Sequence, residues 1–192
     1  MRNTRDRMLD AAAEVMRTRG LARATTKEIA KAAGYSDAAL YKHFQDKTDM
    51  FVAVLMERVP SSLGVLLSEL RPGEGTVAET LERVAADAIE FYTESFPIAA
   101  SVFSEPQLLA AHRDALRQRD AGPQKVNTLL AGYLAAERDL GRISTDADPY
   151  AVAALLLGAC LQHAFLVHFD TDLVTPDRFA ATLVRTLVTG LS

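Results

Sequence analysis

The chain has one cysteine and no long unbroken hydrophobic run. Cys160 has no partner for an intrachain disulfide, and its apolar surroundings indicate a small buried residue rather than a redox sensor. The longest apolar run, 151–161, falls short of the roughly 18 residues that a membrane span needs. The N-terminal MRNTRDRM is charged but has no apolar signal-peptide core. We therefore expect a cytoplasmic protein that does not enter a membrane.

Motifs for catalysis are also missing. The sequence contains no GxSxG, no phosphate-binding glycine loop and no HExxH. Cys160 and His163 share a helix face, but His168 follows five residues later, and no carboxylate stands beside them at metal-ligand spacing. We expect no catalytic site, no metal and no cofactor.

The net charge of −4 conceals two regions of opposite sign. Residues 1–50 hold 10 Lys and Arg against 7 Asp and Glu, whereas the remainder holds 11 against 18. Binding to phosphate depends on local charge, so only the N-terminal part, net +3, suits nucleic acid. We expect a DNA-binding domain at 1–46 and a body at 47–192. The body, net −7, slightly favours neutral or cationic ligands.

Residues 25–51 carry the signals of two short helices joined by a tight turn. Thr25 with Glu28 forms a capping box, and Gly34 suits the left-handed end of the first helix. Ser36 can cap the second helix, which is expected over 36–44 with an apolar face of leucine and phenylalanine. Such a helix-turn-helix places its second helix in the DNA major groove.

The stretch reads T-T-x-x-I-A-x-x-A-G-x-S-x-x-x-L-Y-x-H-F-x-x-K-x-x-x-F, which resembles the signature of the tetracycline-repressor (TetR) family. The resemblance covers the first quarter of the chain. It departs from the family pattern at Tyr35, where a small aliphatic residue is usual, and Asp37 adds a negative charge near the DNA. It implies a homodimer joined by the last two helices and a ligand pocket in the body.

The resemblance also implies phosphate contacts from Thr26, Tyr41, His43 and Lys47. Tyr41 and His43 could instead only cover the surface of the domain. Lys42 contributes to sequence preference if it reads guanine, and small residues at the start of the second helix allow close approach. The complete set expected to face DNA is Thr26, Ser36, Asp37, Ala38, Ala39, Tyr41, Lys42, His43 and Lys47. Arg2 and Arg5 either contact phosphate or are solvated charges at the surface.

Helical periodicity and breakers predict an all-α protein of about nine helices. The fourth, 47–70, contains Pro60, which must kink or interrupt it, and the fifth is expected to close before Pro97. The other expected helices cover 3–19, 25–33, 36–44, 97–119 with a break at Pro106, 124–140, 148–169 and 175–191.

The helix at 148–169 is apolar over more of its circumference than one core face requires. Burial in a homodimer explains this excess, although a central helix of a monomeric bundle would look the same. Apolar residues with a few polar atoms are typical of a small-molecule pocket, and any one of them could be plain core. The candidates for binding an apolar effector are Met56, Tyr92, Phe96, Phe103, Gln162, His163 and Phe165.

The sequence therefore predicts a DNA-binding transcriptional regulator, a repressor released from its operator by a small apolar ligand. One alternative is a helical adaptor that binds protein without DNA, which explains the basic N-terminal part poorly. Another is a helical enzyme acting on an apolar substrate, which the missing catalytic motifs disfavour.

Overall fold

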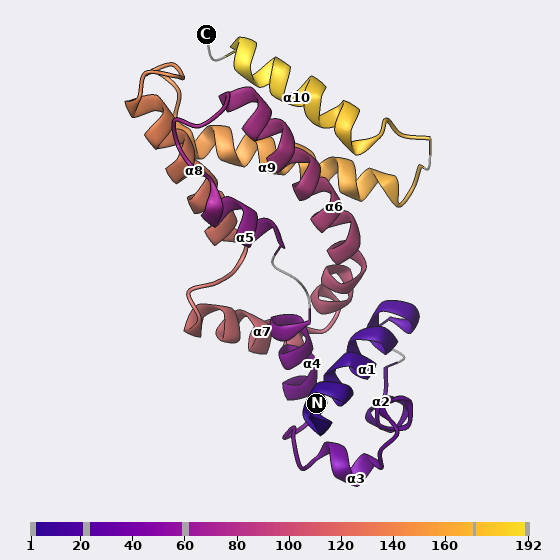
Figure 1. Cartoon of the computed structure of the whole chain (residues 1–192). Helices are drawn as coiled ribbons and strands as arrows, with labels where there is room; N and C mark the ends of the chain where they lie inside the picture. The colour runs from indigo at the N-terminus through magenta and orange to yellow at the C-terminus, as the bar shows by residue number, and fades with distance from the viewer. Residues whose placement is uncertain (1–2, 21–23, 59–61, 171, 191–192) are drawn as a thin grey trace. The chain divides into compact units, whose positions relative to one another are not determined.

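The computed structural model is all-α, as predicted (Figure 1). It describes residues 3–20, 24–58, 62–170 and 172–190. These residues form ten helices: α1 (Thr4–Arg19), α2 (Thr26–Ala33), α3 (Asp37–Leu40), α4 (Lys47–Glu57), α5 (Ser62–Glu69), α6 (Val77–Phe103), α7 (Pro106–Gln118), α8 (Pro123–Asp139), α9 (Pro149–Val167) and α10 (Pro176–Gly190).

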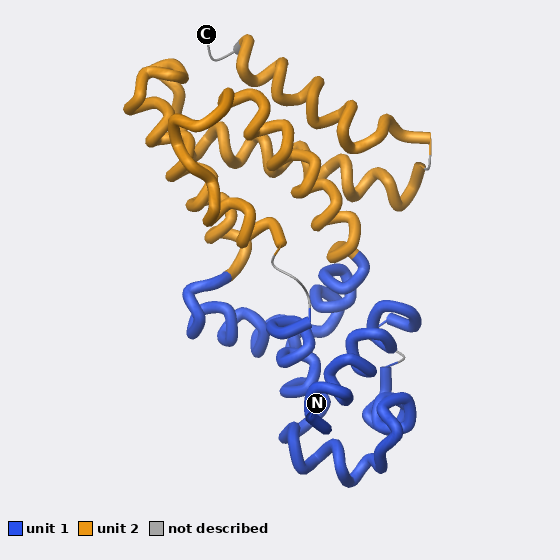
Figure 2. The backbone as a smooth tube through the Cα atoms, in the orientation of Figure 1, with its two compact units in different colours: residues 1–60, 97–121 blue, residues 61–96, 122–192 orange. Residues whose placement is uncertain are grey.

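The helices are divided between two compact units (Figure 2). Unit 1 comprises 1–60 and 97–121, and unit 2 comprises 61–96 and 122–192. Unit 1 extends beyond residue 46 because Met50, Phe51 and Val54 of α4 are buried in the same core as α1. The predicted division of functions at residue 46 stays a prediction.

The core of unit 1 gathers around α1. Its amphipathic face buries Met8, Leu9 and Ala12, and Ile29 of α2 is equally inaccessible. The end of α6 and the start of α7 close this core with Val102 and Leu108. The three N-terminal helices are therefore supported by elements from a distant part of the chain.

The core of unit 2 is built around α9. Asp148 caps this helix by accepting a hydrogen bond from the Ala151 amide at 2.7 Å, and Pro149 occupies its first turn, as predicted. The core face of α9 packs on α8 and α10, and α10 runs beside α9 after the connecting loop (Figure 1). The buried residues of α9 are Val152, Ala153, Leu156, Leu157, Cys160, His163 and Ala164. The expected burial of Cys160 is confirmed.

The prediction that a helix closes before Pro97 is wrong. Pro97 lies inside α6, which continues to Phe103. Proline removes one backbone donor, yet the helix buries Ile89 before this position and Val102 after it. Packing on both sides outweighs the single lost hydrogen bond.

The expected helix at 47–70 is described as α4 and α5, and Pro60 lies outside the described residues, as does Arg2. Two stretches, α9 and Lys47–Glu69, are apolar and long enough to cross a membrane by length and composition. Neither stretch is an unbroken run of about 18 apolar residues. Core helices of globular proteins pass the same test, and α9 supplies seven buried residues to unit 2.

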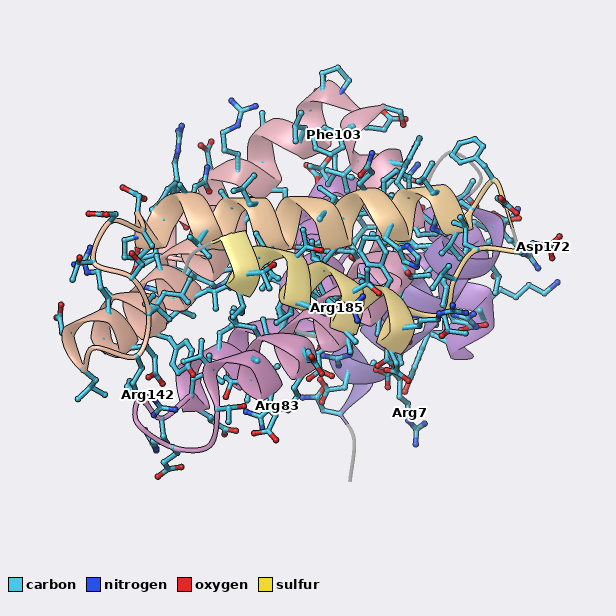
Figure 3. The ribbon with its side chains drawn as sticks, turned by 90° about the horizontal axis from the view of Figure 1, so that it is seen from above. Arg7, Arg83, Phe103, Arg142, Asp172 and Arg185 are labelled. Carbon is cyan, nitrogen blue, oxygen red and sulfur yellow. The ribbon has the colours of Figure 1, made fainter. Side chains whose placement is uncertain are left out.

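A buried carboxylate joins two segments of unit 2. Glu137 of α8 is 0% exposed, and its Oε1 accepts a hydrogen bond from the Gly73 amide at 3.0 Å. Arg142 Nε lies 3.2 Å from Glu137 Oε2, and the same guanidinium donates to the Gly75 carbonyl. Figure 3 shows Arg142 beside the turn that follows α5. Since a buried charge requires a partner, Arg142 allows Glu137 to hold this turn against α8.

Replacing Arg142 by Met should destabilise unit 2 by about 3 kcal/mol, because it leaves Glu137 buried without its partner. Chemical denaturation followed by circular dichroism measures the loss. Arg138→Met is the matched control, since Arg138 pairs at 3.8 Å with the exposed Asp139 and should cost less than about 1 kcal/mol. Equal losses in the two variants would show that the buried pair has no special role.

Candidate nucleic-acid interface

The turn between α2 and α3 has the predicted capping chemistry. Thr25 Oγ1 accepts a hydrogen bond from the Glu28 amide at 3.2 Å, and Glu28 Oε2 accepts one from the Thr25 amide at 3.3 Å. Gly34 adopts the left-handed conformation, φ 80°, in which a side chain would be strained. The Ser36 hydroxyl then accepts from the Ala39 amide at 3.3 Å and starts α3. These local bonds fix where both helices begin and end.

The second helix of the pair is shorter than the predicted 36–44. It covers Asp37–Leu40, after which the amides of Lys42 and His43 bond to carbonyls three residues earlier. Bonds of this spacing form a tighter turn than an α-helix, and Phe44 stays buried after it. Lys42 and His43 therefore lie on the turn that follows α3, which corrects the expectation that they lie on its helical face.

Most residues predicted to face DNA are exposed at the surface of unit 1. Thr26 and Ala39 are partly buried, and Tyr41 is 50% exposed. The hydroxyls of Thr26 and Tyr41 lie 3.4 Å apart, although 15 residues separate them in sequence. The exposed members of the set are Ser36, Asp37, Ala38, Tyr41, Lys42, His43 and Lys47.

Lys47 occupies the first turn of α4. Asp46 caps this helix by accepting from the Asp49 amide at 2.8 Å, and Lys47 Nζ lies 5.1 Å from the centre of the Phe51 ring. A helix N-terminus and a lysine together favour an anion. The position suits a phosphate contact, and the roles of Lys47 and the other predicted DNA-facing residues remain predictions.

Residues 36–44, which contain α3 and the turn after it, are anchored in the core of unit 1 by one aliphatic and one aromatic side chain. Leu40 is 0% exposed and Phe44 is 3% exposed, both within the core that α1 dominates. The Arg5 guanidinium lies 5.4 Å from the centre of the Phe44 ring and makes a bidentate pair with Glu57, at 2.7 and 2.9 Å. Arg5 therefore has a third role beyond the two considered from the sequence, since it joins Phe44 to α4.

A second arginine continues this connection between α1 and α4. Arg58, which ends α4, donates from Nε to Asp10 at 2.7 Å and from Nη2 to Asp6 at 2.9 Å. Hydrogen bonding to Asp10, opposed by burial, raises the pKa of Arg58, and hydrogen bonding to Arg5 lowers the pKa of Glu57. We refer to Arg5, Asp6, Asp10, Glu57 and Arg58 as the clasp.

Tyr35, which departs from the family pattern, also contacts α1. Its ring packs against the core of unit 1, and its hydroxyl bonds to the side chains of Thr4 and Arg7. The bond with Thr4 is the main cause of a lowered pKa for Tyr35. The larger side chain thus links the turn before α3 to the first turns of α1.

The clasp was not found by sequence reasoning. One usable signal was present, because Asp6 and Asp10 are four residues apart and therefore share a helix face. Their partner Arg58 is 48 residues from Asp10, and nothing in the local sequence identifies that pairing. Such contacts depend on how α1 and α4 pack.

The predicted ligand-binding residues are not all in one unit. Met56 and Phe103 belong to unit 1, where Phe103 is 71% exposed, and the other five belong to unit 2. In unit 2 the Phe96 ring lies 5.3 Å from that of Phe165. Gln162 is exposed. The ligand-binding role of all seven remains a prediction.

Tyr92 and His163 occupy the interior side of unit 2. Burial raises the pKa of Tyr92 to about 12, with a smaller contribution from Cys160. Burial also lowers the pKa of His163, whose ring stacks on Phe179 at 4.3 Å. The structure thus supplies an apolar interior with a few polar atoms.

Comparison with known proteins identifies similar chains over both units. Residues 8–54 match the family model described as bacterial regulatory proteins, tetR family. The uncharacterized HTH-type transcriptional regulator YvkB of Bacillus subtilis is 30% identical over 145 residues, which are 76% of this chain and 73% of YvkB. The nucleoid occlusion factor SlmA of Vibrio atlanticus is 30% identical over 165 residues, 81% of this chain and 79% of SlmA.

A likeness of fold extends over almost the whole chain. The crystal structure of the transcriptional regulator FadR from Bacillus subtilis in complex with stearoyl-CoA has a TM-score of 0.69. It covers 97% of this chain and 98% of FadR at 18% sequence identity. At this identity the comparison concerns the arrangement of helices alone.

Replacing Arg58 by Met should destabilise unit 1 by about 2 kcal/mol, because two charge-assisted hydrogen bonds with α1 are lost. Urea unfolding of the full chain measures the change. The control is Arg17→Met, whose pair with Glu14 is solvent-exposed and should contribute less than about 0.5 kcal/mol. A loss no greater than that of the control would contradict the structural importance of the clasp.

Proposed function

The chain belongs to the tetR family of bacterial regulatory proteins, and we propose that it is a transcriptional repressor that leaves its operator when a small apolar ligand binds unit 2. The proposal that the protein binds DNA is supported mainly by the capped helix pair α2 and α3. The pair and the turn after it expose Tyr41, Lys42 and His43 at the surface. It acts by binding, without catalysis or a resident cofactor, in the cytoplasm where its DNA is found.

The proposed contacts with double-stranded DNA divide by chemistry. Thr26, Tyr41, His43 and Lys47 offer hydroxyl, imidazole or ammonium groups to phosphates, which orient the protein on the duplex. The first residues of α3 approach base edges, and Ala38 has no side chain that would hold the helix away from the groove. The family relationship supports this arrangement, and Asp37 at the start of α3 disfavours nearby phosphates.

The proposed effector site lies among the aromatic residues of unit 2. Tyr92 and Phe96 of α6 and His163 and Phe165 of α9 supply apolar surface with hydroxyl and imidazole groups. FadR, which shares the fold, was crystallised with stearoyl-CoA, and this supports a ligand-responsive body. A ligand acts only if it binds the DNA-competent and DNA-free states with different affinity.

The proposed homodimer uses α9 and α10. Away from its core face, α9 exposes three large apolar side chains to solvent: Leu155, Leu161 and Leu166. Patches of this kind mark interfaces in proteins of this size. Dimerisation also gives two recognition helices for half-sites about 34 Å apart.

A second candidate follows from the similarity to SlmA, which is named a nucleoid occlusion factor. The alternative that we consider is a protein that binds many positions on the chromosome rather than a few promoters. Crosslinking followed by sequencing of bound genomic DNA separates the two functions. A small number of bound sites next to promoters would support the repressor. Many bound sites dispersed over the chromosome would support the alternative. The absence of any specifically bound site would contradict both.

Lys47→Ala should weaken binding to all DNA sequences and reduce the slope of log affinity against log salt by about one unit, because one phosphate contact is lost. The measurement is a salt series with a bound genomic fragment. Arg83→Ala, which removes an exposed charge from unit 2, should leave the slope unchanged. An unaltered slope for the Lys47 variant would remove Lys47 from the interface.

Leu155→Glu should convert the dimer to a monomer, because it places a charge in the proposed interface. Sedimentation velocity distinguishes the two states. Val65→Glu is the matched control, since Val65 of α5 is 56% exposed, close to the 62% of Leu155. A monomeric wild-type protein, or two variants with the same assembly, would reject α9 as the interface.

A further inference from the structure

His163 is a buried polar residue on the core face of α9. Its side chain is 4% exposed, and it follows Leu156 and Cys160 along the buried side of the helix. The imidazole stacks on the Phe179 ring of α10, with centres 4.3 Å apart and planes inclined by 21°. The ring position is thus determined by packing against the neighbouring helix.

One nitrogen of this imidazole is satisfied and the other is not. His163 donates a hydrogen bond to the backbone carbonyl of Val174, in the loop before α10. Within the described part of the chain, Nε2 is buried and has no hydrogen-bond partner. The donor is therefore Nδ1, and because burial lowers the pKa of His163, the ring is neutral and Nε2 presents a lone pair.

A buried acceptor without a donor is unfavourable, and proteins usually satisfy such atoms with water or a ligand. Cys160 lies one turn before His163 on α9, and burial raises the pKa of Cys160 and of Tyr92 to about 12. No lysine, arginine or carboxylate contributes to the pKa of Tyr92, Cys160 or His163. Burial, and not a neighbouring charged side chain, is therefore the main cause of the pKa shifts of these three groups.

We propose that Nε2 of His163 accepts a hydrogen bond from the hydroxyl group of an uncharged apolar ligand. This rests on the effector function proposed for unit 2 and specifies the chemical class of the effector. A carboxylate cannot serve, because it has no proton to donate and no cation there offsets its desolvation. A hydrocarbon of the same shape would bury its surface equally well but leave Nε2 unsatisfied.

The probes are 1-naphthol, 1-methylnaphthalene and 1-naphthoate, which share a ring system and differ in the group offered to Nε2. Calorimetric titration of the full chain should give about tenfold tighter binding of 1-naphthol than of 1-methylnaphthalene, and no comparable binding of 1-naphthoate. Equal affinity for 1-naphthol and 1-methylnaphthalene, tightest binding of 1-naphthoate, or binding of no probe overturns the proposal.

Two variants locate the effect. His163→Phe keeps an aromatic ring against Phe179 but removes the acceptor, and it should abolish the preference for 1-naphthol. His112→Phe is the matched control, because His112 of α7 in unit 1 also has a buried Nδ1 without a partner among the described residues. A preference that survives in His163→Phe, or disappears in His112→Phe, contradicts the assignment.

Nitrogen NMR of the wild-type protein gives a second test that does not depend on the folding of a variant. The Nε2 resonance of His163 should begin at the value of an unprotonated nitrogen and move upfield on saturation with 1-naphthol, while Nδ1 stays protonated. An Nε2 resonance that does not move overturns the proposal.

The same samples should be tested for binding to the selected genomic fragment. Specific DNA binding without His163-dependent recognition of 1-naphthol rejects this inference and leaves the regulator intact. Absence of specific DNA binding rejects the proposed regulatory function instead. The calorimetric titrations with the three naphthalene probes still decide the role of His163.

Discussion

The burial of Leu40 and Phe44 in the core of unit 1 is the packing on which the DNA-binding surface depends. A helix as short as α3 has too few internal hydrogen bonds to be stable alone, so tertiary packing must hold it. Phe44 also receives the Arg5 guanidinium, and Arg5 reaches α4 through Glu57. The exposed residues beside α3 thus rest on a core shared with α1 and α4.

The clasp extends this dependence to the end of α4. Because both arginines pair with carboxylates on the other helix, α1 and α4 are joined by charged contacts as well as by their apolar faces. Unit 2 contains a comparable arrangement, in which Glu137 and Arg142 hold a turn against α8. In both units, polar side chains fix elements that hydrophobic packing alone would leave free to shift.

Local chemistry was the part of the fold that the sequence could predict. The capping pair of Thr25 and Glu28, the left-handed Gly34 and the caps at Ser36 and Asp148 depend on residues within a few positions of one another. Features that depend on distant residues were not predictable. The clasp, the passage of α6 through Pro97 and the contact between Thr26 and Tyr41 result from packing between elements far apart in the sequence.

The central claim is specific binding of DNA by unit 1, and fluorescence anisotropy of a labelled genomic fragment tests it most directly. The fragment is selected with the purified protein and titrated over a salt series, with a scrambled duplex of the same length for comparison. The account predicts tighter binding of the selected fragment and a steep fall of affinity with salt, because several phosphate contacts are involved. Equal affinity for both duplexes, or affinity independent of salt, would contradict it.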